Sequence, residues 1–201
     1  MTLLVGVAND RFSALIADRR ITQNGVVLDD CYNKLCVLCC FDARVAIAFT
    51  GIATSSGFDT SMWIFDALAG VSGTTPLADI LEMLRVEAAP ALRDAGLGQH
   101  RLDIFVCGVS HDNASSQGTA CAYTISNLSA GGLVEPNFHM HVHSAIDGII
   151  VEFAGATDGL SKDAGHQITK VLKSTANKFH TIKRSIGILQ KAAASPRSSN
   201  L

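Results

Sequence analysis

The stretch TLLVGVANDRFSALIADRR, residues 2–20, contains the pattern that decides the fold. Residues 2–8 and 12–18 are rich in Val, Ile, Leu and Ala, and the turn-forming pair Asn9-Asp10 lies between them, which predicts a hairpin of two strands. The first strand begins with Thr2, directly behind the initiator methionine, where any strand-forming residue would suit the pattern. This position indicates that the chain uses Thr2 as a processed N-terminus.

The rest of the chain alternates between strand and helix patterns. Further strands are predicted at 34–41, 43–50, 102–109, 120–126, 138–146 and 148–156. Helical spacing occurs at 58–70, 75–96, about 158–177 and about 181–194. Pro90 is expected to kink or end the second helix.

This element order predicts one α+β domain over residues 1–201, with a frayed tail from about 195. Two antiparallel sheets would face each other, and helices would cover their outer sides. The expected architecture is therefore a four-layer αββα sandwich.

Composition excludes several classes of protein. A hydrophobic content of 48 % supports a sizeable core, and a net charge of −2 gives no electrostatic case for nucleic acid or an anionic membrane. No run reaches the roughly 18 apolar residues of a membrane-spanning helix. The N-terminus has no secretory leader, so we expect a cytoplasmic protein whose six cysteines are mostly buried free thiols.

An N-terminal threonine carries its own catalytic base. Methionine before a small residue is readily removed in the cytoplasm, which would free the α-amine of Thr2. That amine has an ordinary pKa of about 7.7–8.0 and can take the proton of the neighbouring hydroxyl near neutral pH. Nucleophile and base then belong to one residue, a variant of the Ser-His-Asp arrangement.

Two charged residues are candidates to assist Thr2. If residues 9–11 form the hairpin loop, residue 8 pairs with residue 12 and Asp18 lies opposite Thr2, although a shift of one residue stays open. Lys34 precedes an apolar run and would lower the pKa of the Thr2 hydroxyl and amine. Spacing alone does not bring Lys34 to Thr2, because a tight hairpin at Asn24-Gly25 would place it opposite Leu15.

With Thr2, ALIADRR around Asp18, NKL around Lys34 and AFTGIA around Gly51, the first half of the chain resembles proteasome β-type subunits and bacterial heat-shock peptidase subunits. The resemblance implies the N-terminal-nucleophile hydrolase sandwich and a threonine endopeptidase. Thr2 would be the nucleophile, Asp18 and Lys34 would tune it, and the Gly51 N–H would stabilise the oxyanion. At the second strand-to-helix turn the family has Gly-Ser-Gly; here Thr157 supplies the corresponding hydroxyl.

The resemblance further implies a pocket for a substrate side chain and a ring of subunits. The expected pocket residues are Ile21, Tyr32, Cys36, Phe49 and Ala53. The expected partners are further copies of the chain in a single or double ring, a peptide or unfolded substrate, and a separate ATP-dependent unfoldase. No cofactor, metal, nucleic acid or membrane is expected.

Three other functions stay open. The same Thr2 machinery would serve an amidase or transpeptidase with a small or specific substrate. The chain could also be a ring-forming scaffold without activity. Finally, His139, His141 and His143 occupy alternate positions of one predicted strand and therefore share a face. They could bind a metal ion there. The other interpretation is a polar strand face at a subunit contact or in a chamber.

Overall fold

The computed structural model describes residues 3–9, 12–23, 26–55, 57–111, 118–145 and 149–155, together with Lys170. The strands of the first half are β1 (Leu3–Ala8), β2 (Ser13–Ala17), β3 (Ile21–Gln23), β4 (Val26–Asp29), β5 (Leu35–Cys39), β6 (Ala43–Gly51), β7 (Thr54–Ser55) and β8 (Phe58–Asp59). The helices α1 (Thr60–Ala69) and α2 (Leu77–Asp94) follow, and then β9 (Leu102–His111), β10 (Gly118–Leu128), β11 (Val134–Val142) and β12 (Ile150–Gly155).

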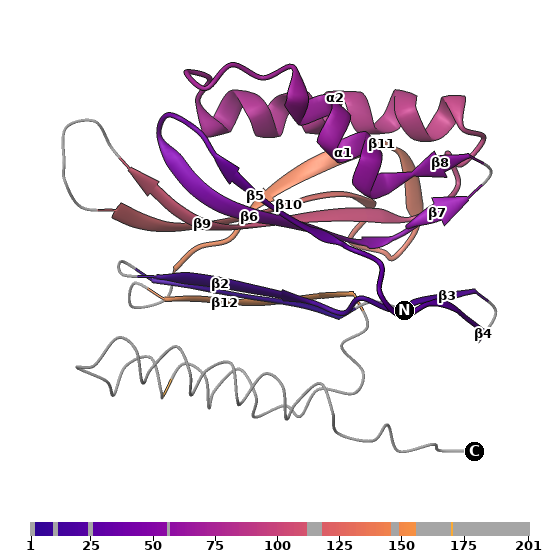
Figure 1. Ribbon diagram of the computed structural model, residues 1–201, viewed down its shortest axis with the longest axis horizontal. Helices are drawn as coiled ribbons and strands as arrows, with labels where there is room; N and C mark the ends of the chain where they lie inside the picture. The colour runs from indigo at the N-terminus through magenta and orange to yellow at the C-terminus, as the bar shows by residue number, and fades with distance from the viewer. Residues whose placement is uncertain are drawn as a thin grey trace.

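Two antiparallel sheets face each other. One sheet has five strands in the order β11-β10-β9-β6-β5, and the other has three in the order β12-β1-β2. Figure 1 shows α1 and α2 together on the outer face of the five-stranded sheet, with β2 and β12 beneath its inner face. The first strand therefore belongs to the smaller sheet, where it lies between β12 and β2, and one of its faces packs on the larger sheet.

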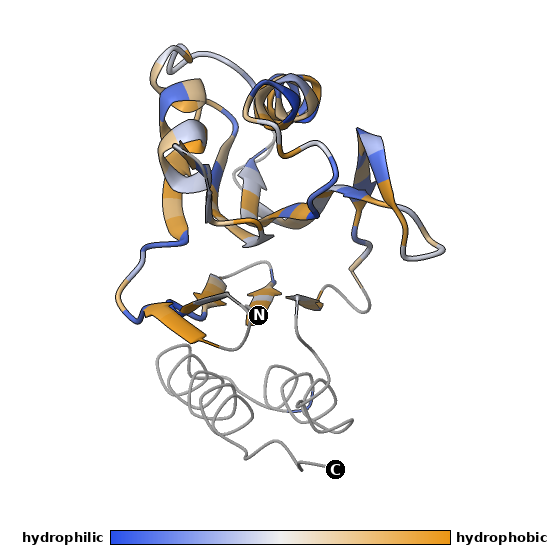
Figure 2. Cartoon of the chain, turned by 90° about the vertical axis from the view of Figure 1, so that its right-hand side faces the viewer, coloured by the Kyte–Doolittle hydropathy of each residue, from blue (hydrophilic) through white to orange (hydrophobic). Residues whose placement is uncertain are grey.

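Each face of the five-stranded sheet packs into its own core, as the alternation of side chains along a strand requires. The face toward α1 and α2 includes Phe49 and Ile104, whereas the face toward β1 includes Phe105 and Cys107. A Cβ on Gly6 would lie 2.3 Å from the Phe105 ring, so glycine permits this close approach of the sheets. Hydrophobic residues also colour the strands of the smaller sheet in Figure 2.

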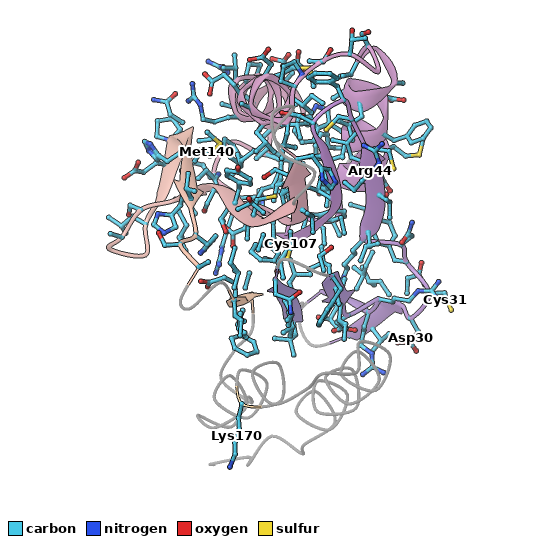
Figure 3. The ribbon with its side chains drawn as sticks, turned by 90° about the vertical axis from the view of Figure 1, so that its left-hand side faces the viewer. Asp30, Cys31, Arg44, Cys107, Met140 and Lys170 are labelled. Carbon is cyan, nitrogen blue, oxygen red and sulfur yellow. The ribbon has the colours of Figure 1, made fainter. Side chains whose placement is uncertain are left out.

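The cysteines follow the expectation only in part. All six thiols are free, and Cys40, Cys107 and Cys121 are buried, whereas Cys31 and Cys39 are exposed. Figure 3 places Cys107 between the two sheets, and burial there raises its pKa to about 12. The Cys107 thiol is accordingly a packing group in its protonated form.

The predicted αββα sandwich is wrong for the described residues. They are mostly strand, 52 % against 21 % helix, and they form one helical layer and two facing sheets, besides the small two-stranded sheets β3-β4 and β7-β8. The helices expected at about 158–177 and 181–194 lie outside the described residues, except for the single residue Lys170. The helix predicted at 75–96 corresponds to α2, and Pro90 does not end it, because α2 continues through Pro90 to Asp94.

The register of the first hairpin differs from the expected one by one residue. Leu4 pairs with Ala17 and Ala8 pairs with Ser13, so the loop spans residues 9–12. The Phe12 N–H donates to the Asn9 side chain over 2.9 Å, which closes this longer loop. The turn chemistry of Asn9, not the strand pattern, sets the register.

We predict that Asp42 stabilises the start of α2 from a distance in sequence. Pro76 at the N-cap offers no side-chain hydrogen bond, and the Leu77 N–H donates instead to Asp42 Oδ1 over 2.8 Å. Asp42→Ala is expected to lower the free energy of unfolding in urea by about 1 kcal/mol. Asp42→Asn, which keeps an acceptor oxygen, should lose less; equal losses for both would contradict the capping role.

Candidate active site

Lys34 is a buried cation at the centre of the candidate site. Lys34 is only 2 % exposed, and its Nζ donates a hydrogen bond to the Arg20 carbonyl oxygen over 2.5 Å. Burial lowers the pKa of Lys34 below its ordinary value, and the negative charge of Asp18 opposes part of this effect. The ammonium thus sits in a place that penalises charge, with a carboxylate close enough to act on it.

Asp18 is fixed to the start of β1. Its backbone N–H donates to the Leu3 carbonyl oxygen over 3.0 Å, and its Oδ1 accepts from the Arg20 N–H over 3.0 Å. On the other side of β1, Leu3 pairs with Gly155 of β12. Residues from three distant parts of the sequence therefore meet at Leu3, the residue that follows Thr2 in the chain.

The β3–β4 ribbon explains why Lys34 reaches Asp18. These two strands pair with each other in a separate two-stranded sheet and extend beyond the facing sheets in Figure 1. At the base of the ribbon, Arg20 Nε lies 2.8 Å from Asp30 Oδ1, and the Arg19 guanidinium donates to the Cys31 carbonyl oxygen. Residues 19–20 and 30–31 are consequently neighbours at the base of the ribbon, and the chain after them brings Lys34 to Arg20 and Asp18, whereas a simple count along a continuous hairpin would place Lys34 opposite Leu15.

Gly51 ends β6 in a conformation that requires glycine. Its φ is +101°, and an added Cβ would lie 2.1 Å from the Arg101 carbonyl oxygen. The next amide, that of Ile52, donates to the same Arg101 oxygen over 2.9 Å. Because hydrogen bonds alternate along an antiparallel ladder, the Gly51 N–H points away from β9 and toward the side of β5, where Lys34 precedes Leu35.

The five expected pocket residues are close in space but differ in exposure. Phe49 and Ala53 belong to the buried cluster beneath α1 and α2, and the other three are half-buried against it. Tyr32 contacts the edge of Phe49 with ring centroids 6.3 Å apart, and its hydroxyl donates to Asp59 over 2.6 Å. Ile21, Tyr32 and Cys36 thus keep some exposure, whereas Phe49 and Ala53 are buried.

Thr2 and Thr157 lie outside the described residues. The nearest described residues in the chain are Leu3, directly after Thr2, and Gly155, two residues before Thr157, and these two are paired in one ladder. Of the expected catalytic residues, the structure brings Asp18 and Lys34 together and gives Gly51 its special backbone.

At the histidine strand, His139 forms one polar pair, and His143 belongs to a separate group of three polar residues. His139 Nε2 lies 2.8 Å from Glu135 Oε2, whereas His143 lies between Glu152 at 3.1 Å and Thr124 at 2.8 Å. Within the described part of the chain, no group of three or more His, Cys, Asp or Glu side chains has a geometry that could hold a metal ion.

Sequence reasoning missed a buried polar cluster beneath Gly51. Asn127 and Asp103 are 1 % and 3 % exposed, and both support the residues around Arg101. The available signals were an aspartate within the apolar run 102–109 and an asparagine directly after the run 120–126. Neither position belongs to the motifs that suggested the site.

The described arrangement can stabilise negative charge near the start of β1. A buried ammonium and an outward-directed backbone N–H are the two kinds of group that stabilise an oxyanion or a deprotonated hydroxyl. Asp18 keeps the ammonium charge partly compensated. These features are those that an activated N-terminal hydroxyl would need.

Comparison with known proteins gives a relationship of fold. No protein-family model matches the chain, and no curated protein matches it. A solved structure of Anbu, a Gly-1 mutant from Hyphomicrobium sp. strain MC1, matches with a TM-score of 0.59 and 16 % identity, over 100 % of this chain and 76 % of that one. At that identity the likeness is evidence for the fold alone.

This finding corrects the expected family. Anbu is a proteasome-related bacterial protein of N-terminal-nucleophile type, and it forms a family distinct from the proteasome β-type and heat-shock peptidase subunits. The assignment of the chain to those subunits from its motifs is therefore wrong.

None of the described helices is long and apolar enough to cross a membrane.

Proposed function

We propose that the chain is an N-terminal-nucleophile hydrolase that cleaves amide bonds. The Thr2 hydroxyl attacks the acyl carbon, its proton passes to the Thr2 α-amine and then to the leaving amine, and the resulting ester is hydrolysed by water. Lys34 and Asp18 tune the hydroxyl and amine, and the Gly51 N–H stabilises the oxyanion. Thr157 supplies a further hydroxyl to the site.

The observation that carries this proposal is the buried Lys34 ammonium beside Asp18 at the start of β1. A lysine side chain is seldom fully buried, because removal of its charge from water is costly. A hydrolytic role explains that cost, since perturbed cations cluster at catalytic sites. The half-buried Ile21, Tyr32 and Cys36 favour substrates with an apolar acyl side chain.

We expect purified protein with a free Thr2 amine to hydrolyse fluorogenic acyl amides, and Thr2→Ala to abolish turnover. Thr2→Ser should retain turnover because it keeps both the hydroxyl and the amine. Two classes of substrate separate an amidase from an endopeptidase. An amidase hydrolyses the small acyl amides, whereas an endopeptidase hydrolyses the longer peptides. Equal turnover by Thr2→Ala and the wild type would overturn the proposal.

A second candidate function is a ring-forming scaffold without turnover. The supporting observation is the β3–β4 ribbon, whose consecutive residues Val26, Val27 and Leu28 are 62 %, 44 % and 56 % exposed. An isolated two-stranded ribbon is marginally stable, and such an apolar stretch is typical of a surface that another chain covers. Repeated head-to-tail contacts between copies close into a ring when the rotation permits.

Sedimentation of the same variants tests the scaffold. A scaffold predicts that the wild type and Thr2→Ala form the same oligomer and that neither hydrolyses any amide. A hydrolase that works in a ring predicts the same oligomer with turnover in the wild type alone. A monomeric wild type would contradict every ring. The cytoplasmic location remains part of the proposal, since methionine removal there exposes Thr2.

A further inference from the structure

A buried polar group surrounds the backbone of Arg101, the residue on which the Gly51 turn rests. Asn127 Oδ1 accepts from the Leu102 N–H, and Asn127 Nδ2 donates to the His100 carbonyl oxygen, each over 2.9 Å. One side chain therefore holds the peptide units on both sides of Arg101. At 1 % exposure, Asn127 makes these bonds away from water, where an unmade bond is most costly.

The side chain of Arg101 is also fixed by hydrogen bonds. Its Nε donates to Asp103 Oδ2 over 2.8 Å, and its terminal nitrogen contacts the same oxygen. The other carboxylate oxygen of Asp103 accepts from the Ser126 hydroxyl over 2.5 Å. Asp103 is 3 % exposed, so this is a buried carboxylate with a full set of partners.

We propose that Asn127 and Asp103, together called the Arg101 bracket, are positioning residues for the Gly51 N–H. The catalytic consequence rests on the proposed function, whereas the structural consequence does not. The bracket presents the Arg101 carbonyl oxygen to the Ile52 N–H over 2.9 Å. Gly51 approaches the same oxygen so closely that a Cβ would lie 2.1 Å away.

This contact makes the position of Gly51 depend on that of Arg101. Its positive φ and tight approach leave one arrangement in which the Ile52 bond forms. If the Arg101 carbonyl moves, the Gly51 amide moves with it. A displacement of about 1 Å at a catalytic group can reduce a rate by about 10²-fold.

Two variants and one matched control test the bracket. Asn127→Ala removes both bonds, and Asp103→Asn keeps the shape while it removes the charge. Asn9→Ala is the control, because Asn9 is also buried and also bonds a backbone amide, but at the far end of β1. The three are compared at equal loss of global stability, adjusted with urea.

The first readout is hydrogen exchange of the Ile52 amide. We expect its protection to fall at least about 10-fold in Asn127→Ala relative to Asn9→Ala, because the bond to Arg101 opens locally. Unchanged protection would overturn the bracket, whether or not the protein is an enzyme. Asp103→Asn gives the same test if Asn127→Ala does not fold.

The second readout is acylation of Thr2 by a β-lactone. We expect the rate to fall about 10–100-fold in the bracket variants, and the kcat for an amide substrate to fall similarly with its KM unchanged. A wild-type rate of acylation in both variants would overturn the catalytic part. A wild type that takes up no label would overturn the proposed function instead, and Ile52 exchange then decides the bracket alone.

Discussion

Replacement of Lys34 by methionine is expected to slow acylation of Thr2 by about 10²-fold or more, while the protein keeps or gains stability. The loss of rate follows from removal of the buried ammonium that favours the deprotonated hydroxyl. Stability need not fall, because an apolar chain of similar length replaces a charge held at 2 % exposure. The measurements are the acylation rate and unfolding in urea.

Lys170→Met is the control for this variant, since Lys170 is exposed. It should change neither the rate nor the stability. If Lys34→Met acylates as fast as Lys170→Met, the buried ammonium has no part in the reaction. If Lys34→Met does not fold, Lys34→Arg, which keeps the positive charge, separates loss of the fold from loss of the charge.

The lowered pKa of Lys34 sets the direction in which stability and acylation change with pH. In the unfolded chain the lysine returns to its ordinary pKa of 10.5, so between the folded pKa and 10.5 the unfolded state binds more protons. The free energy of unfolding of the wild type should therefore rise with pH across that window, relative to Lys34→Met. Acylation by the wild type should fall across the same window as the ammonium loses its charge.

Gly51→Ala is expected to lower the free energy of unfolding by about 3 kcal/mol and to abolish detectable acylation. The strain of a positive φ costs alanine about 1–2 kcal/mol. The remainder comes from the backbone shift needed to relieve a Cβ contact of 2.1 Å with the Arg101 oxygen. That shift also displaces the Gly51 amide, which we propose stabilises the oxyanion.

Gly132→Ala separates the two effects. Gly132 also has a positive φ, +79°, but no atom lies within 4 Å of an added Cβ. It should lose about 1 kcal/mol and acylate normally. Equal losses of stability in the two variants would contradict the tight approach of Gly51 to Arg101.

The sequence predicts most strands of the two facing sheets well, because their apolar runs are long and bounded by turn residues, whereas β11 (Val134–Val142) begins four residues before the predicted strand 138–146. The run 102–109 corresponds to β9 (Leu102–His111), and the run 43–50 corresponds to β6 (Ala43–Gly51). The hairpin register was missed because an Asn9 side chain closes a longer loop. The layer count differs because α1 and α2 both lie on one outer face, and the two helices expected after β12 fall outside the described residues.

The site was predictable only as a set of residue types. Asp18 and Lys34 stood out as charges beside apolar runs, but their contact depends on the β3–β4 ribbon, which leaves the sheet and returns. Hydrophobic patterns in a sequence do not predict that a pair of strands leaves one sheet and returns to it. Asn127 and Asp103 act through the Arg101 backbone, and a side chain that bonds backbone leaves no spacing signal in the sequence.

The motif resemblance and the comparison of folds lead to different families, and the reason is physical. The motifs around Asp18, Lys34 and Gly51 are short and local, and related families can share such motifs. The comparison of folds covers the whole chain, and it shows a likeness of fold to Anbu at 16 % identity.

The central claim is that Thr2 is an activated nucleophile beside Lys34 and Asp18, and intact mass tests it most directly. Wild-type protein and Thr2→Ala are weighed before and after treatment with a threonine-directed β-lactone or epoxyketone. A wild-type chain that lacks Met1 and gains one inhibitor mass, while Thr2→Ala gains none, is the result that we predict. A chain that keeps Met1, or loses it and takes up no label, would contradict the claim and leave the scaffold as the function.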